Sequence, residues 1–205
     1  MKYIGILGAG GFAREVFCWA TQAGFEVVHF YDGTKEQETT LVIGQKAIPV
    51  SKKLVPDIKY VIGVGDPNLK AKIISIVGIE QLSEAIVHPQ AILGEDVIIG
   101  LGSIVAPNVI ITTNISIDIC ASLHYGVTIG HDCKIGRFFN AAPGANISGN
   151  VTIGHLTSIG TNAALREKIN LTDNVTIGMG SIVIKDITEA GTYIGSPAKV
   201  YKKKS

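Results

Sequence analysis

The carboxyl-terminal half of the chain repeats a hydrophobic position every six residues. From Val87 to Val183, 16 of the 17 positions at this spacing are Leu, Ile or Val. These three residue types make up 60 of the 205 residues, so chance would supply only about five. A period of six fits neither a helix nor a simply alternating strand, and it is typical of hexapeptide β-helices. The pattern therefore predicts a left-handed parallel β-helix.

Three hexapeptides complete one coil of such a helix, and successive coils stack about 4.8 Å apart. Residues one coil apart in the sequence therefore share a column. Five apolar residues outside the six-residue repeat fall on one face of the predicted helix: Leu101, Ile119, Cys120, Phe138 and Leu156. A contiguous outward apolar surface usually marks an interface, so we expect a contact between subunits here.

The first 85 residues follow a different pattern, in which short apolar runs alternate with helical stretches. We expect strands at 3–7, 25–31 and 60–64 and helices at 14–23 and 69–77. Glycine turns follow the first and third strands, at the edge where open parallel sheets bind ligands. The sequence thus predicts a Rossmann-like domain over residues 1–85 and a β-helix domain over residues 86–205.

The first glycine turn has two possible roles. Gly8, Gly10 and Ala13 fit the G-x-G-x-x-[GA] fingerprint, and Asp32 follows at about the distance expected of a ribose-binding acid. Alone, this favours a dinucleotide and a dehydrogenase, but the domain is half a dinucleotide fold and no hydride site follows. A glycine loop at a helix start binds the phosphates of any nucleotide, whereas the structural alternative is close strand–helix packing. We favour a nucleotide or nucleotide-sugar site.

Charge and composition exclude several classes of partner. Lys plus Arg number 18 and Asp plus Glu 17, so no basic field exists for nucleic acid or an anionic membrane. No apolar run approaches the roughly 20 residues that span a bilayer, and the amino terminus does not resemble a signal peptide. Three cysteines without metal-ligand spacing favour a reducing, cytoplasmic environment.

His131 and Asp132 form an ionisable pair within the repeat, in the stretch I-G-H-D-C-K-I-G. A histidine suits acyl transfer at neutral pH, since an attacking amine or hydroxyl must lose its proton. The neighbouring carboxylate can orient the ring, but only if the backbone bends between them. Gly149, one coil further, would leave space beside the ring for a pantetheine arm. The structural alternative is a solvated pair at a turn.

The whole chain resembles a known family. A small Rossmann-like domain with G-A-G-G, a β-helix with I-G-H-D-C-x-I-G and a closing I-G-S-P-A-K are similar to bacterial sugar acetyltransferases of the hexapeptide superfamily. The branch includes sialic acid O-acetyltransferase-like proteins and the N-acetyltransferases of UDP-linked bacillosamine and GDP-perosamine.

The resemblance implies a homotrimer with active sites between subunits, acetyl-CoA as co-substrate and no metal. It implies His131 as general base, with Asp132 raising its basicity. It implies acetyl-CoA contacts at Asn140, Gly149, Gly160 and Thr161, and nucleotide-sugar contacts at Gly10, Gly11, Phe12, Tyr31, Asp32, Gly65 and Asp66. Family members often have histidine where this chain has Phe12 and Asn140.

These observations lead to one expected function and three alternatives. We expect acetyl-CoA-dependent acetylation of the amino group of a nucleotide-linked sugar. Acetylation of a sugar hydroxyl would use the same base. A γ-carbonic-anhydrase-like metalloenzyme would need three histidines converging across a trimer interface, which the spacing of His88, His124, His131 and His155 does not clearly supply. A nucleotide-responsive binding protein would need no chemistry at all.

Overall fold

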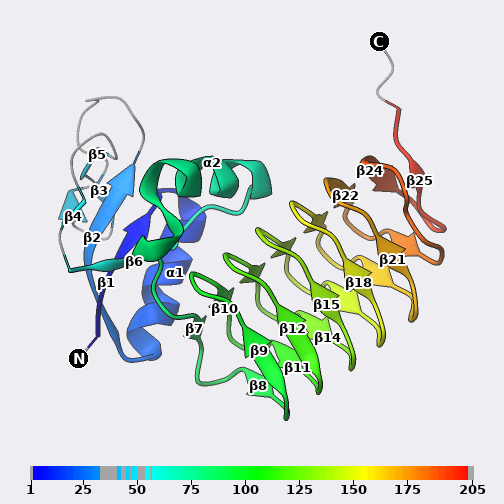
Figure 1. Cartoon of the computed structure of the whole chain (residues 1–205), viewed down its shortest axis with the longest axis horizontal. Helices are drawn as coiled ribbons and strands as arrows, with labels where there is room; N and C mark the ends of the chain where they lie inside the picture. The colour runs from blue at the N-terminus through cyan, green and yellow to red at the C-terminus, as the bar shows by residue number, and fades with distance from the viewer. Residues whose placement is uncertain are drawn as a thin grey trace.

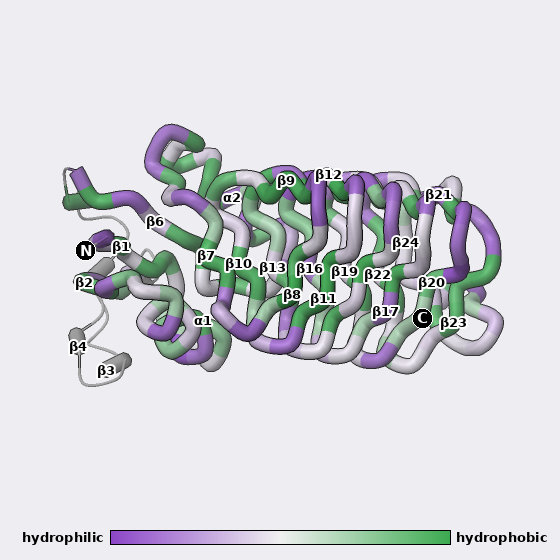
Figure 2. The backbone as a smooth tube through the Cα atoms, turned by 90° about the horizontal axis from the view of Figure 1, so that it is seen from below, coloured by the Kyte–Doolittle hydropathy of each residue, from purple (hydrophilic) through white to green (hydrophobic). Residues whose placement is uncertain are grey.

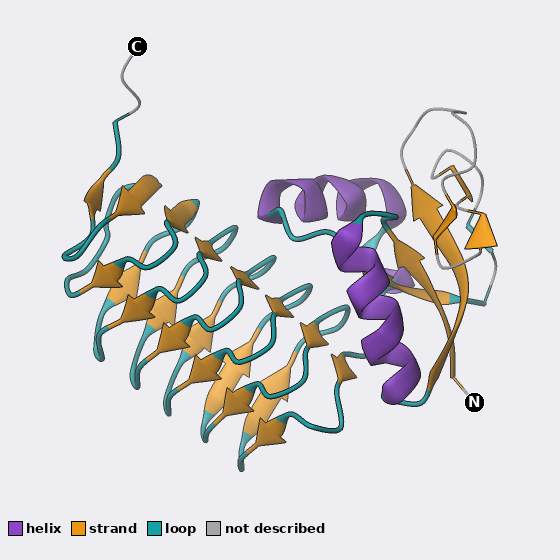
Figure 3. Cartoon of the chain, turned by 180° about the vertical axis from the view of Figure 1, so that it is seen from behind, coloured by secondary structure: helices purple, strands orange, loops and turns teal. Residues whose placement is uncertain are grey.

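The computed structural model describes residues 2–32, 41–42, 45–46, 48–49, 54–55 and 57–202. The chain forms a small α/β unit followed by a long stack of coils (Figure 1). The two parts touch, because helix α1 lies between the sheet of the α/β unit and the first coils (Figure 3). The predicted combination of a Rossmann-like unit and a β-helix is confirmed.

The α/β unit is built on a parallel sheet whose described strands have the order β5-β2-β1-β6. Its elements are β1 (Lys2–Leu7), α1 (Gly11–Gln22), β2 (Phe25–Asp32), β3 (Leu41–Val42), β4 (Gln45–Lys46), β5 (Ile48–Pro49), β6 (Lys59–Ile62), α2 (Pro67–Val77) and a 3-10 helix (Ile79–Gln81). Strands β3 and β4 form a separate antiparallel pair. The sheet order places β1 and β6 side by side, so the turns that follow them lie at one edge.

Both helices begin earlier than the hydrophobic pattern predicted, for local reasons. Helix α1 starts at Gly11, directly after the extended Gly10, so the glycine turn is very short. Helix α2 starts at Pro67, which suits the first helical position because that position needs no N–H donor. The Asp66 side chain accepts a hydrogen bond of 2.7 Å from the Leu69 N–H and caps the helix.

The coils consist of three parallel sheets that run along the stack. One sheet contains β7 (Ile86–Val87), β10 (Ile104–Val105), β13 (Ser122–Leu123), β16 (Asn140–Ala141), β19 (Ser158–Ile159), β22 (Val175–Ile177), β24 (Gly191–Ile194) and an antiparallel β25 (Lys199–Val200). The second contains β8 (Ile92–Leu93), β11 (Ile110–Ile111), β14 (Thr128–Ile129), β17 (Asn146–Ile147), β20 (Ala164–Leu165) and β23 (Ile182–Val183). The third contains β9 (Val97–Ile99), β12 (Ile115–Ile117), β15 (Lys134–Ile135), β18 (Thr152–Ile153) and β21 (Asn170–Leu171).

The register confirms the predicted columns. Ser122 pairs with Ile104 on one side and with Asn140 on the other, an offset of 18 residues in each direction. Each of these strands in the three sheets up to β23 ends on a position of the six-residue repeat, and most of those side chains point into the coil and are buried. Hydrophobic segments accordingly recur along successive coils (Figure 2). Leu93, on the first coil, is 36% exposed because no coil lies beneath it.

Every sixth residue from 96 to 180 turns a corner with a positive φ angle. These residues are Asp96, Gly102, Asn108, Asn114, Cys120, Gly126, Asp132, Phe138, Gly144, Asn150, Leu156, Asn162, Lys168, Asn174 and Gly180. Glycine has no Cβ, and Asn and Asp tolerate the left-handed region better than other residues do. The corner explains how His131 and Asp132 can meet although they are adjacent in the chain.

The predicted outward apolar face requires a correction. Cys120 is buried, and Ile119 and Phe138 pack against a cluster that belongs mainly to the α/β unit. We name this cluster of buried residues the junction cluster; it comprises Leu7, Tyr31, Tyr60, Ile62, Ile74, Leu82 and Cys120. The chain's own first unit therefore covers most of the face that the sequence assigned to a neighbouring subunit. Of the five residues only Leu101 is exposed, at 46%, and Leu156 is half-buried.

Within the described residues, no helix has the length and apolar character needed to cross a bilayer.

Candidate active site

His131 and Asp132 occupy the corner between strands β14 and β15. The Nδ1–H of His131 donates a hydrogen bond of 2.6 Å to Oδ2 of Asp132, since a carboxylate can only accept. The positive φ of 60° at Asp132 bends the backbone and brings the two side chains to the same side. Both are exposed, and Nε2 of the ring remains for exchange with a substrate. The predicted pairing is thus present.

Gly149 lies next to this ring, but not in the predicted way. A Cβ added at Gly149 would lie 2.6 Å from Nε2 of His131 and 2.8 Å from its Cε1. The imidazole itself therefore fills the space that the sequence assigned to a pantetheine arm. The absence of a side chain at Gly149 lets the ring lie flat against the next coil.

Asp132 is held from a second side. Nδ2 of Asn114, one coil earlier, donates a hydrogen bond of 2.6 Å to the other carboxylate oxygen, Oδ1. The hydrogen bond from His131 lowers the pKa of Asp132, and the one from Asn114 lowers it further. The carboxylate is therefore ionised at neutral pH with both oxygens engaged, an arrangement suited to stabilising a protonated imidazole.

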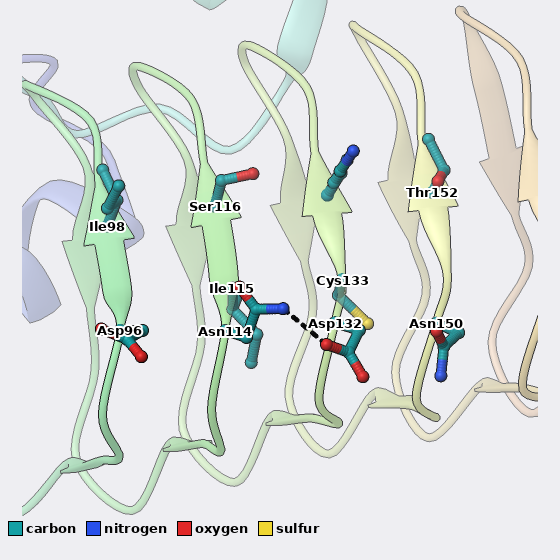
Figure 4. Close-up of a pocket in the computed structure, with 10 residues that line it drawn as sticks. Asp96, Ile98, Asn114, Ile115, Ser116, Asp132, Cys133, Asn150 and Thr152 are labelled. Atoms are coloured by element: carbon teal, nitrogen blue, oxygen red, sulfur yellow. Dashed lines mark hydrogen bonds between the residues drawn. The ribbon is translucent and has the colours of Figure 1, made fainter.

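A groove of about 420 Å³ runs across the coils beside this corner. Figure 4 shows four of its lining residues, Asp96, Asn114, Asp132 and Asn150, side by side on successive coils. A second row of residues lines the groove further along the strands: Ile98, Ser116, Lys134 and Thr152. Asp132 thus lines the groove together with mainly polar residues, whereas its partner His131 is not one of the lining residues.

The glycine turn of the α/β unit has the features of a binding turn. Gly8 has a φ of 130°, and a Cβ there would lie 2.8 Å from the carbonyl oxygen of Gly63. Gly63 packs just as closely on Ala13 of α1. Close packing therefore explains Gly8 and Ala13, but it does not explain Gly10, where a Cβ would meet no atom within 4 Å. Open space beside Gly10, directly before helix α1, leaves its backbone accessible to an anion.

The other residues predicted to contact the nucleotide-sugar differ in how accessible they are to a ligand. Tyr31 is completely buried, and its carbonyl oxygen accepts a hydrogen bond of 2.6 Å from the Gly8 N–H, so the residue offers no exposed atom to a ligand. Asp32 ends β2, and its side chain lies outside the described residues. The carboxylate of Asp66 caps α2, and Gly65 lies in the turn just before it. Gly11, the first residue of α1, is exposed.

The α/β unit meets the coils at a place that we name the covered junction, comprising Phe12, Lys70, His124 and Asn140. The Phe12 ring stacks on His124 with centroids 4.5 Å apart. Asn140 is 9% exposed, and its Oδ1, for which the described residues supply no hydrogen-bond partner, lies towards Gly65. The Gly65 turn thus lies next to the coil residue that was predicted to contact acetyl-CoA.

Lys70 is the residue of the junction that sequence reasoning missed. It is 1% exposed, and its ammonium group donates to Oγ of Ser122 at 2.7 Å. It also donates to the carbonyl oxygens of Phe139 at 3.1 Å and Cys120 at 3.2 Å. All three acceptors belong to the coils, so Lys70 ties α2 to them. A lysine on an amphipathic helix looks like a solvated residue in the sequence, and no local signal marks it as buried.

Burial also shifts the pKa values of the junction. Desolvation lowers the pKa of Lys70 to about 7. Desolvation and the nearby charge of Lys70 lower the pKa of His124 to about 4. His124 is therefore neutral at pH 7 and is a structural ring rather than a base.

The four predicted acetyl-CoA contacts do not gather within one chain. Asn140 lies under the α/β unit, whereas Gly149 lies beside His131 at a different corner. Gly160 and Thr161 occupy a third position, on the corner that follows strand β19. A Cβ at Gly160 would lie 2.6 Å from the backbone of Met179, so the packing of coils is enough to explain this glycine.

No group of three or more His, Cys, Asp or Glu side chains in the described part of the chain is arranged to hold a metal ion.

Comparison with known proteins agrees with this architecture. Residues 3–77 match the model of the PglD N-terminal domain. The chain is 28% identical over 165 residues to the GDP-perosamine N-acetyltransferase of Escherichia coli O157:H7, covering 73% of this chain and 71% of that protein.

Two solved structures share almost the full length. WeeI from Acinetobacter baumannii AYE superposes with a TM-score of 0.87 at 26% identity, covering 98% of this chain and 100% of that one. PerB from Caulobacter crescentus, solved with CoA and GDP-perosamine, has the same fold, with a TM-score of 0.87, 22% identity and 98% coverage of both chains. By its fold, its amino-terminal domain and its relatives, the chain is similar to nucleotide-linked amino-sugar N-acetyltransferases of the hexapeptide-repeat type.

Proposed function

We propose that this protein transfers the acetyl group of acetyl-CoA to the amino group of a nucleotide-linked sugar, with His131 as the general base. The observation that carries this proposal is the His131–Asp132 hydrogen bond of 2.6 Å at an exposed corner, with Nε2 free of protein partners among the described residues. The relative that acts on GDP-perosamine and the CoA bound to PerB supply the substrate class.

The chemistry follows from this geometry. As the sugar amine attacks the thioester carbonyl carbon, Nε2 of His131 accepts one of its protons, and the new C–N bond forms. Asp132 stabilises the resulting imidazolium through Nδ1. The tetrahedral intermediate then expels the CoA sulfur as the C–S bond breaks, and the imidazolium returns a proton to it. A base of this kind accelerates transfer by about 10²–10⁴-fold.

The α/β unit would hold the nucleotide of the acceptor. The Gly10 turn precedes α1 and the Gly65–Asp66 turn precedes α2, and both follow neighbouring parallel strands. Backbone N–H groups at helix starts bind phosphates. Phosphate contacts at Gly10 and Gly11, with the sugar extending past Phe12 and Gly65, fit this edge.

The position of His131 supports a site built by two chains. Its corner joins the sheets of β14 and β15, whereas the α/β unit contacts the sheet of β7 and β13 and the corners beside it. Within one chain, the Gly10 turn proposed to bind the nucleotide and the proposed base His131 therefore lie on different sides of the coil stack. In a homotrimer, a neighbouring chain can present His131 to the acceptor, and the separated acetyl-CoA contacts can converge in the same way.

Thioester consumption with a panel of nucleotide-linked amino-sugars tests the activity. We expect free thiol to appear with an amino-sugar acceptor, and His131→Ala to lower kcat by at least about 10²-fold with CoA binding retained. Transfer to acceptors that carry only hydroxyl groups would instead make the enzyme an O-acetyltransferase. Undiminished activity of His131→Ala would remove this residue from the mechanism.

Subunit complementation tests the shared site. His131→Ala and Gly10→Val should each be inactive alone, because one lacks the base and the other blocks the phosphate turn. Co-expressed in equal amounts, they should recover about a quarter of the wild-type activity if each site takes the base from one chain and the turn from its neighbour. No recovery from mixed assemblies would mean that one chain supplies both.

A further inference from the structure

Asn114 stands out among the polar corner residues of the coils. Seven of the corners with positive φ carry Asn or Asp, which the backbone conformation alone explains. Asn114 does more than tolerate this conformation, because its amide is aimed at Asp132 on the next coil, at 2.6 Å from Oδ1 (Figure 4). Asn150 has the same conformation on the coil beyond Asp132, and it makes no such hydrogen bond within the described residues.

We infer that Asn114 is a positioning residue for acetyl transfer, acting on His131 through Asp132; this inference rests on the proposed function. Each of the two carboxylate oxygens of Asp132 accepts one hydrogen bond. His131 takes Oδ2 and Asn114 takes Oδ1, so the carboxylate cannot rotate without losing one hydrogen bond. Fixing the carboxylate fixes the direction of Nδ1, and hence the direction in which Nε2 faces the substrate.

The exposed setting makes this second hydrogen bond matter. The side chains of His131 and Asp132 are 57% and 42% exposed, so no surrounding core holds them in place. Gly149 supports one side of the ring, and the backbone bend at Asp132 supplies the other constraint. Without Asn114, water would compete for Oδ1 and the carboxylate would sample other orientations.

The test compares two matched substitutions, Asn114→Gly and Asn150→Gly. Both corners have positive φ, 54° and 58°, so glycine removes the amide from each without backbone strain. Asn114→Gly should lower kcat by about 3- to 10-fold, the modest effect of an exposed hydrogen bond to a charged group. The KM values for both substrates should stay the same, because the role inferred for Asn114 is to orient Asp132 and not to bind a substrate. Asn150→Gly should match the wild type.

A double substitution separates positioning from folding. With Asp132→Gly already in place, which the positive φ of 60° at this corner allows, Asn114→Gly should have no further effect on kcat, since no side chain remains at position 132 for Asn114 to orient. Equal kcat values for Asn114→Gly and Asn150→Gly, or a full additional loss in the Asp132→Gly background, would overturn the inference. A wild-type enzyme without acetyl transfer, or a fully active His131→Ala, would instead refute the proposed function.

Discussion

The exposed corner at His131 and Asp132 and the covered junction differ in how they use ionisable groups. Both involve residues of the same stack of coils. At the exposed corner, hydrogen bonds lower the pKa of Asp132 while the pair stays in contact with solvent. At the covered junction, burial lowers the pKa of Lys70 and of His124. The first set of groups can exchange protons with a substrate, whereas the second ties two parts of the chain together.

This difference shows that the coil itself does not assign a role to a polar residue. His124 follows strand β13 by one residue and His131 follows strand β14 by two, so both lie just after a strand of the repeat, yet their ring environments are opposite. Phe12 stacks on the first, whereas the second packs against Gly149 and is 57% exposed. The cover supplied by the α/β unit decides which histidine can act as a base.

The covered junction should be the more sensitive to acid. The folded-state pKa of His124, about 4, lies below its unfolded value of about 6.5, so the unfolded chain binds a proton first as the pH falls. The stabilisation is therefore complete above pH 6.5 and is lost between pH 6.5 and 4. His124→Phe keeps the ring stack on Phe12 but cannot titrate. Between pH 7.5 and 4, the wild type should lose about 3 kcal/mol of unfolding free energy relative to this variant, measured by urea denaturation. If the unfolding free energies of the two proteins changed with pH in parallel, His124 would take up its proton as readily in the folded chain as in the unfolded chain.

At the exposed corner, activity should instead depend on the space that Gly149 leaves for the His131 ring. Gly149→Ala places a methyl group 2.6 Å from the present position of Nε2, so the ring of His131 must move. We expect kcat to fall by about 10²-fold, the contribution of a general base, with little change in stability. The same substitution in the His131→Ala background should be silent, because no ring remains to be displaced. A full effect in that background would assign Gly149 to the binding of acetyl-CoA instead.

Raising the pH should strengthen the junction through Lys70. Its folded pKa of about 7 lies below the unfolded value of about 10.4, so deprotonation relieves the buried charge in the folded state alone. Stability should therefore rise with pH above about 7, whereas Lys70→Met should lack this gain. Between pH 6.5 and 8.5 the difference in unfolding free energy should change by about 2 kcal/mol in favour of the wild type. Burial raises the pKa of Cys120 to about 12, but this acts in both proteins and cancels in the comparison. A constant difference would mean that three hydrogen bonds keep Lys70 charged throughout.

The smallest expected effect is a change in stability at Phe138 and Leu156, where one column of corners passes from covered to partly exposed. Phe138 and Leu156 occupy the same corner on successive coils with φ near 60°, a conformation unfavourable for both. Phe138 packs against the junction cluster and Leu156 is not part of that contact. Leu156→Asn should therefore stabilise an isolated chain by about 0.5–1 kcal/mol, whereas Phe138→Asn should destabilise it. Thermal unfolding measures both changes. A destabilised Leu156→Asn that also loses its assembly in sedimentation would assign Leu156 to a subunit contact.

Much of this molecule was determined by sequence alone, because its repeat is local. A hydrophobic residue at every sixth position defines the inside of each coil, and Asn, Asp and Gly define its corners, so columns such as Asn114 and Asp132 follow from counting. The pairing of His131 with Asp132 and the glycine turn at Gly10 were likewise predicted.

Tertiary structure decided what covers the coils. The sequence assigned Cys120 and Phe138 to a subunit interface, whereas α2 and the junction cluster of the same chain pack on them. It gave no sign that Lys70 is buried or that His124 is stacked. The physical reason is that the repeat encodes contacts between neighbouring coils, while the docking of the α/β unit depends on the shape and desolvation of surfaces far apart in the chain.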